Sequence, residues 1–117
     1  MKPAPIKAEI SIDDLEKIDI RAGTILSATP VEGSRKLAKL QVDFGDHQRQ
    51  VLAGLVQERA DLSEVEGQQA LFVLNLPARE MAGERSEGML FDIGYADGVT
   101  PVLAVTEKRI PDGSRAG

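Results

Sequence analysis

The sequence predicts an all-β fold, a small five-stranded Greek-key barrel, and three observations lead to it. Short apolar stretches, several with strict two-residue alternation, recur along the chain and are separated by turn-forming residues. Helical patterns are short and few. The 117 residues include no cysteine, so one apolar core has to hold the fold without disulfides. We therefore expect one domain.

The chain is expected to begin with an arm and a short helix. Residues 1–10 hold two prolines and little pattern, which predicts a flexible N-terminal arm. Ser11 can cap a helix, and Asp13 and Asp14 are favoured near the positive end of its dipole. This helix should end near Lys17 or Ile18, so that residues 11–117 form the folded domain with its C-terminal extension.

The strands follow from the apolar pattern. Leu40, Val42 and Phe44 alternate with polar residues, whereas residues 70–76 form a nearly continuous apolar run typical of a central strand. Gly23 suggests a bulge or bend in the first strand, and a single helical turn is expected at residues 60–66. The predicted strands cover residues 18–29, 39–44, 51–55, 70–76, 89–93 and, as a sixth segment, 101–105. Short strands with one helix after the third favour a barrel of the OB type.

Composition argues against an enzyme. His47, the single histidine, lies in a turn-like polar string, and without a second histidine or a cysteine neither a His-dependent triad nor a conventional zinc site can be assembled. Gly83 and Gly88 have the spacing of a phosphate-binding loop, but Met89 and Leu90 stand where Lys and Ser or Thr are required. We predict no catalytic residue, no metal site and no cofactor.

Residues 18–90 resemble the tRNA-binding OB domains found free-standing in CsaA-type proteins and as the C-terminal appendix of methionyl-tRNA synthetase. The matching blocks are Ile18-Asp19-Ile20-Arg21-Ala22-Gly23-Thr24-Ile25, the stretch from Ser34 to Gly45, Gln50-Val51-Leu52-Ala53-Gly54-Leu55, and Asn75-Leu76 with the following Gly83-Glu84-Arg85-Ser86-Glu87-Gly88-Met89. The resemblance implies a non-catalytic domain that recognises the folded shape of tRNA.

The same resemblance implies which residues contact RNA. Family members place the Asn and the Ser-x-Gly-Met element beside cations on the RNA-binding face, and Glu80 departs from the basic residue that CsaA-type sequences tend to have. Asn75 could instead stabilise a bend, and Met89 could belong to the core. The candidate RNA-binding residues are Arg35, Lys36, Lys39, Arg49, Asn75, Arg79, Arg85, Ser86 and Met89.

The charge distribution permits this reading despite a net charge of -5. Residues 35–50 hold four Lys or Arg against two Asp, a local +2, whereas residues 51–70 hold one Arg against four acids, a local -3. A field acts over a Debye length of about 8–10 Å, so a basic face can hold phosphate on an acidic protein. About four or five phosphate contacts would give weak, salt-sensitive binding.

Aromatic content favours folded RNA over extended single strands. Phe44, Phe72 and Phe91 fall on inferred inward or central strand positions, where core packing is expected, and Tyr95 completes the aromatic set. A protein that binds single strands without sequence preference needs several exposed aromatic rings on which bases stack. This chain has too few aromatic residues to supply them, so folded RNA is the expected ligand.

Two further expectations concern partners and location. The resemblance implies a homodimer built from residues 10–18 and about 101–117, used as terminal extensions. CsaA-type proteins are also linked with protein export, so a chaperone that binds extended or unfolded peptides is the alternative. No apolar run of signal-peptide or membrane-span length occurs, which predicts a cytoplasmic protein without membrane contact.

Overall fold

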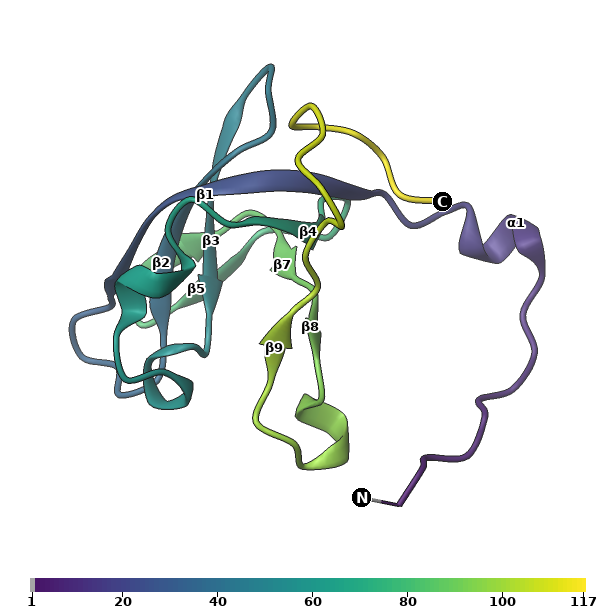
Figure 1. Cartoon of the computed structure of the whole chain (residues 1–117), viewed down its shortest axis with the longest axis horizontal. Coiled ribbons are helices and arrows are strands. Elements are labelled where there is room, and N and C mark those ends of the chain that lie inside the picture. Colours follow the sequence, from purple (N-terminus) through teal and green to yellow (C-terminus); the bar gives the residue numbers. More distant parts are fainter. Residues whose placement is uncertain (1) are drawn as a thin grey trace.

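The computed structural model describes residues 2–117 and is mostly β, with a curled five-stranded antiparallel sheet at its centre (Figure 1). The sheet order is β3-β2-β1-β4-β7. Its strands are β1 (Ile20–Pro30), β2 (Ala38–Asp43), β3 (Gln48–Ala53), β4 (Gln69–Val73) and β7 (Met89–Leu90). Two small hairpins, β5 (Arg79–Met81) with β6 (Glu84–Ser86) and β8 (Asp92–Ile93) with β9 (Val102–Leu103), complete the β structure. The predicted all-β, OB-like fold is confirmed.

The long strand β1 organises the sheet because it pairs with two neighbours in succession. Its first half lies against β4, from Ile20 opposite Val73 to Thr24 opposite Gln69, and its second half lies against β2. Gly23 was expected to mark a bulge, but the register shift lies between Ile25 and Ser27. Gly23 is required for another reason, since an added Cβ would lie 2.6 Å from Cε1 of Phe44.

The helical segments are short, as expected. Helix α1 (Ile12–Leu15) is capped by the Ser11 side chain, which accepts a hydrogen bond from the Asp14 amide at 3.0 Å. The predicted turn after β3 is the 3₁₀ helix η2 (Leu62–Val65), preceded by η1 (Val56–Glu58) and followed much later by η3 (Tyr95–Asp97). None of the helices within residues 2–117 is long and apolar enough to cross a membrane.

The core fills the hollow of the curled sheet. Ile25, Leu40, Val51 and Phe72 are fully buried, and the Phe44 and Phe72 rings meet edge to face at 5.5 Å. The prediction that Phe91 belongs to the core is wrong, because 39% of that residue is exposed. The expected fifth strand breaks at Phe91 into β7 and β8, so this ring lies outside the closely packed interior.

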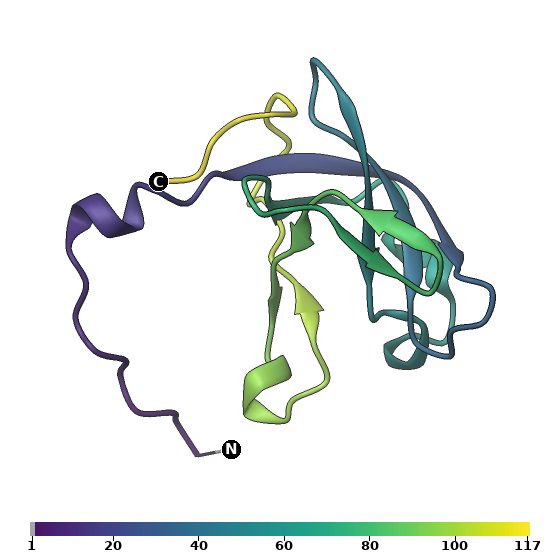
Figure 2. The same cartoon turned by 180° about the vertical axis from the view of Figure 1, so that it is seen from behind.

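The last residues return to the first strand. The amide of Ala22 donates to the Ser114 carbonyl at 2.9 Å, and the Gly113 amide donates to the Ala22 carbonyl at 2.8 Å. Nearby, Gln69 donates to the Ile110 carbonyl and to Asp112. We call residues 104–116 the C-terminal strap. Figures 1 and 2 show it running beside β1, whereas α1 and residues 2–11 stand away from the sheet.

Candidate nucleic-acid interface

The polar stretch between β4 and β7 contains the β5–β6 hairpin. Arg79 pairs with Ser86, and Glu80 pairs with Arg85. The two connecting residues, Ala82 and Gly83, have φ values of 50° and 79°, the positive values that a tight two-residue hairpin turn requires. Gly83 supplies this conformation without strain. Gly83 is a local sequence signal for the turn, but the strands on either side of it carry no apolar pattern.

Ser86 attaches this hairpin to the sheet. The residue is only 3% exposed, and its hydroxyl accepts a hydrogen bond from the Leu52 amide at 3.0 Å and donates one to the Gly88 carbonyl at 3.1 Å. A second bond joins the Glu87 amide to the Gln50 carbonyl at 2.8 Å. Ser86 therefore positions β6 against β3, because its hydroxyl is buried and already engaged.

Arg49 also has a positioning role. One terminal nitrogen, Nη1, donates to the Leu74 carbonyl at 2.8 Å and to the Glu87 carbonyl at 3.1 Å. Its Nε donates to Nε2 of His47 at 3.0 Å, so the proton of the neutral imidazole lies on Nδ1, which contacts Asp46 at 2.6 Å. The His47 hydrogen bond lowers the pKa of Asp46. Arg49 thereby links the ends of β4 and β6.

Asn75 uses both ends of its amide on the backbone. Its Oδ1 accepts from the Asp19 amide at 2.8 Å, and its Nδ2 donates to the Lys17 carbonyl at 2.6 Å. The side chain thus holds the segment between α1 and β1 against the end of β4. This geometry matches the bend-stabilising alternative for Asn75.

Four of the predicted cations are exposed. Arg35 and Lys36 lie in the loop before β2, and Arg79 and Arg85 lie on the hairpin. Arg85 has Glu80 at 3.8 Å, an exposed and weak pairing. Lys39 is partly buried and lies 3.4 Å from Glu84, so its charge is partly compensated.

The fold brings a cation of the loop before β2 and a cation of the hairpin together at one cavity. Lys36 and Arg79 both line a cavity of about 650 Å³, which we call the hairpin cavity, and Met89 lines it as well. Met89 is 44% exposed and lies outside the buried core. Lys36, Arg79 and Met89, far apart in the sequence, thus share one surface feature.

The hairpin cavity also contains acidic groups that sequence reasoning missed. Glu58 and Asp92 line it. Burial, followed by the nearby charge of Asp92, raises the pKa of Glu58. Nothing in the local sequence around Glu58 signals this position, because the cavity forms only when η1, the hairpin and β8 come together.

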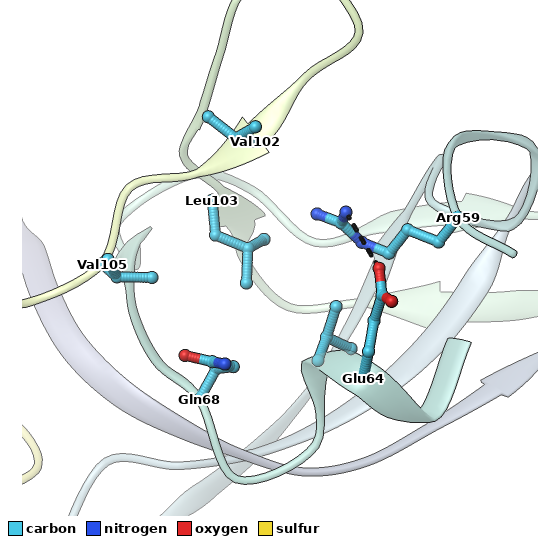
Figure 3. Close-up of a pocket in the computed structure, with 7 residues that line it drawn as sticks. Arg59, Glu64, Gln68, Val102, Leu103 and Val105 are labelled. Atoms are coloured by element: carbon cyan, nitrogen blue, oxygen red, sulfur yellow. Dashed lines mark ion pairs between the residues drawn. The ribbon is translucent and has the colours of Figure 1, made fainter. Parts of the chain in front are cut away.

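A second cavity lies apart from all predicted site residues. It has a volume of about 370 Å³ and lies between η2 and the strap side of β9, where Val102, Leu103 and Val105 face Arg59 and Glu64 (Figure 3). Arg59 and Glu64 form an ion pair at 3.7 Å. Across residues 2–117, no cluster of three or more His, Cys, Asp or Glu side chains is arranged to hold a metal ion.

Comparison with known proteins agrees with this architecture. Residues 20–115 match the protein family described as "Putative tRNA binding domain". Methionine–tRNA ligase of Chlorobaculum tepidum is 41% identical over 96 residues, which cover 82% of this chain and 14% of that protein. The corresponding ligase of Chlorobium limicola is 45% identical over 92 residues, or 79% of this chain and 13% of the relative. The chain therefore spans about a seventh of the length of these relatives.

Two solved structures have closely similar folds. The methionyl-tRNA synthetase related protein of Pyrococcus horikoshii superimposes with a TM-score of 0.87 at 29% identity, covering 95% of this chain and all of that one. The chaperone CsaA of Bacillus anthracis gives a TM-score of 0.81 at 26% identity, covering 94% of this chain and all of that one. The sequence match extends over most of the chain, from the start of β1 into the C-terminal strap, and so includes the hairpin and the loop before β2. This chain belongs to the tRNA-binding domain family.

Proposed function

We propose that this chain is a non-catalytic module that binds tRNA by its folded shape, through the face formed by the β5–β6 hairpin and the loop before β2. One observation carries the proposal: Lys36 and Arg79 line a single cavity in a member of a tRNA-binding family. Arg35 and Arg85 are also exposed, in the same loop and on the same hairpin, but they do not line this cavity. The strands and loops around this face are held in place by four further residues, Lys39, Arg49, Asn75 and Ser86.

Electrostatics sets the expected strength. Four exposed cations correspond to about four phosphate contacts, so the logarithm of the binding constant should fall with the logarithm of salt concentration with a slope of about −3. The acidic total of the chain opposes long-range attraction, and binding should be in the micromolar range or weaker.

A double charge reversal tests this face. Arg79→Glu with Arg85→Glu should abolish a gel shift with tRNA, because two phosphate contacts are lost and replaced by repulsion. The matched control is Lys2→Glu with Lys7→Glu, which changes the net charge equally in the exposed N-terminal arm. A shift that survives the hairpin reversal, or that both pairs of substitutions weaken alike, contradicts the proposed face.

Dimerisation is proposed as well. Ile12 and Leu15 of α1 are 68% and 52% exposed, and Ile93 and Val102 of the β8–β9 hairpin are 58% and 54% exposed. Apolar side chains gathered on terminal segments are typical of surfaces that a second copy covers. Sedimentation equilibrium at micromolar concentration should give twice the chain mass, and Ile12→Asp with Leu15→Asp should give the monomer. A wild-type monomer contradicts this part of the proposal.

Peptide binding is the second candidate function. It is supported by the fold shared with the chaperone CsaA of Bacillus anthracis and by the exposed apolar residues of the β8–β9 hairpin. An unfolded polypeptide bound at the same face should compete with tRNA and should resist added salt. Binding of tRNA that no unfolded polypeptide displaces favours the RNA function.

A further inference from the structure

The hairpin cavity combines an apolar wall with a polar rim, and this combination indicates what could occupy it. Leu52 and Leu90 are nearly buried where they line it, and Met81 and Met89 add flexible thioether side chains. Such a wall suits a flat, weakly polar group, because methionine adapts its shape to an incoming ring. Its volume of about 650 Å³ is ample for one nucleotide.

One exposed aromatic ring lies at this cavity. Tyr95 is 75% exposed and is a lining residue of the cavity, at the start of η3. An exposed tyrosine ring next to an apolar wall can stack on a base. A single ring can stack on one base, whereas a protein that binds single strands without sequence preference needs several such rings.

Hydrogen-bond acceptors are available beside this wall. Glu58 lines the cavity, and its Oε2 is buried with no hydrogen-bond partner among residues 2–117. Asp92 adds a second carboxylate. A buried acceptor without a partner is costly, so a rotation of the Glu58 side chain that turns its carboxylate toward the N–H donors of a ligand gains free energy. Carboxylates accept hydrogen bonds from base amino groups and repel a base edge made mainly of carbonyl oxygens.

The charge balance separates this cavity from a simple phosphate site. Lys36 and Arg79 contribute two positive charges to the lining, and Glu58 and Asp92 contribute two negative charges. A free phosphate therefore gains little from entering. A nucleotide gains more, since its base can reach the carboxylates while the flanking phosphates approach the two cations.

We propose that the hairpin cavity is a subsite for one unpaired nucleotide of the bound RNA, with guanine preferred and uracil disfavoured. The base stacks on Tyr95 and packs against Met81 and Met89, and its Watson–Crick edge donates hydrogen bonds to Glu58. Guanine fits because its N1 and N2 groups are adjacent N–H donors, whereas uracil presents one donor between two carbonyl oxygens. This inference rests on the proposed tRNA-binding function and adds base selection to recognition by shape.

Short RNAs test the subsite without the rest of a tRNA. Four hexanucleotides, UUGUUU, UUAUUU, UUCUUU and UUUUUU, would be titrated into the full chain and followed by fluorescence anisotropy and by the methyl NMR signals of Met81 and Met89. UUGUUU should bind at least fivefold more tightly than UUUUUU, as expected for one well-formed base contact, and should shift both methyl signals.

Three variants assign the preference to residues. Tyr95→Ala should weaken UUGUUU about five- to tenfold, and Tyr95→Phe should restore binding because it keeps the ring. Glu58→Gln should remove most of the preference for guanine over uracil. Glu32→Gln, an exposed position in the turn before β2, makes the same chemical change away from the cavity and should leave the preference intact. Circular dichroism confirms that each variant is folded.

The outcomes are separable from those of the tRNA proposal. The subsite is overturned if all four hexamers bind equally, or if binding leaves the methyl signals of Met81 and Met89 unshifted. This holds even if tRNA binds and Arg79→Glu with Arg85→Glu abolishes that binding. A preference for guanine that Glu58→Gln leaves unchanged also overturns it. An apolar peptide that shifts the two methyl signals while no hexamer does so assigns the cavity to peptide and rejects the nucleotide.

Discussion

At the scale of single residues, Gly23 shows how one missing side chain permits the curled sheet. It lies near the point where β1 leaves β4 and begins to pair with β2. An added Cβ would lie 2.6 Å from Cε1 of Phe44 and 2.7 Å from Cγ1 of Val42, both parts of the core. The glycine is therefore needed for close packing and not for an unusual backbone angle.

Gly23→Ala should destabilise the fold by about 1–3 kcal/mol, the usual cost of forcing extra volume into a packed core. Urea unfolding monitored by circular dichroism would measure the loss. Gly54→Ala is the matched control, because an added Cβ there meets no atom within 4 Å, and it should change stability by less than about 1 kcal/mol. Equal effects of the two substitutions would refute the packing argument.

Asn75 illustrates a second residue-scale point, that a family motif residue can act through the backbone. Asn75→Ala should free the Asp19 amide and the Lys17 carbonyl, at a cost of about 1–2 kcal/mol. Hydrogen exchange of the Asp19 amide should accelerate about tenfold. Affinity for tRNA should change less than for Arg79→Glu. A large loss of affinity with unchanged Asp19 exchange would instead assign Asn75 to the RNA.

At the scale of elements, the β5–β6 hairpin carries the candidate site and was the least predictable part of the fold. Strands β1 to β4 can be predicted from apolar alternation or from an apolar run, because each has a buried face. The sequence Arg79-Glu80-Met81 has no such pattern, and β5 is largely exposed. The hairpin depends instead on Ser86, Gln50 and Arg49, whose hydrogen bonds come from distant parts of the chain. Long-range bonds of this kind leave no local trace in a sequence.

The turn of this hairpin offers a direct test. Ala82 has a φ of 50°, a conformation that costs an alanine about 1 kcal/mol and that asparagine tolerates better. Ala82→Asn, which creates the favoured Asn-Gly turn, should raise the free energy of unfolding by about 0.5–1 kcal/mol. Thermal melting would detect this. Ala78→Asn, an exposed change before β5, should give no gain, and a similar gain there would contradict the turn argument.

At the scale of the whole molecule, Asp19 joins both ends of the fold. Its carboxylate accepts from Arg21 at 2.9 Å and lies 3.4 Å from Arg115 of the C-terminal strap. The hydrogen bond from Arg21, with the charges of Arg21 and Arg115, lowers the pKa of Asp19. A lowered pKa stabilises the folded state above the pKa of the unfolded chain, and this stabilisation is lost as pH falls through the folded value.

Asp19→Asn should therefore lower stability at neutral pH, by about 0.5–1 kcal/mol for a pair that is partly exposed. The difference from wild type should shrink as the pH falls from the pKa of the unfolded chain through the lower, folded pKa of Asp19. Urea midpoints measured between pH 7 and pH 2 would follow it. Asp13→Asn, in the exposed helix α1, is the control. A difference that stays constant with pH would exclude the ion pairs as its source.

The sequence predicts part of the charge distribution on the surface. Counting acids and bases by segment indicated a basic stretch that holds Arg35 and Lys36, the family resemblance added Arg79 and Arg85, and all four are exposed. The count could not separate these cations from Lys39, whose carboxylate partner Glu84 lies 45 residues away, or from Arg49, whose carbonyl partners lie 25 and 38 residues away. Charge alone also gave no reason to expect Glu58 beside Arg79. Pairing and burial depend on the tertiary fold, which a segment count does not contain.

The C-terminal strap has a consequence for biosynthesis. Ribosomes make β1 early, yet the edge of β1 at Ala22 bonds to Gly113 and Ser114, among the last residues of this sequence to be made. During most of translation that edge is an open template for another strand. Folding of this sheet therefore cannot finish before the strap has been made, and a nascent or truncated chain that ends before the strap carries an aggregation-prone edge that the strap covers in the folded structure.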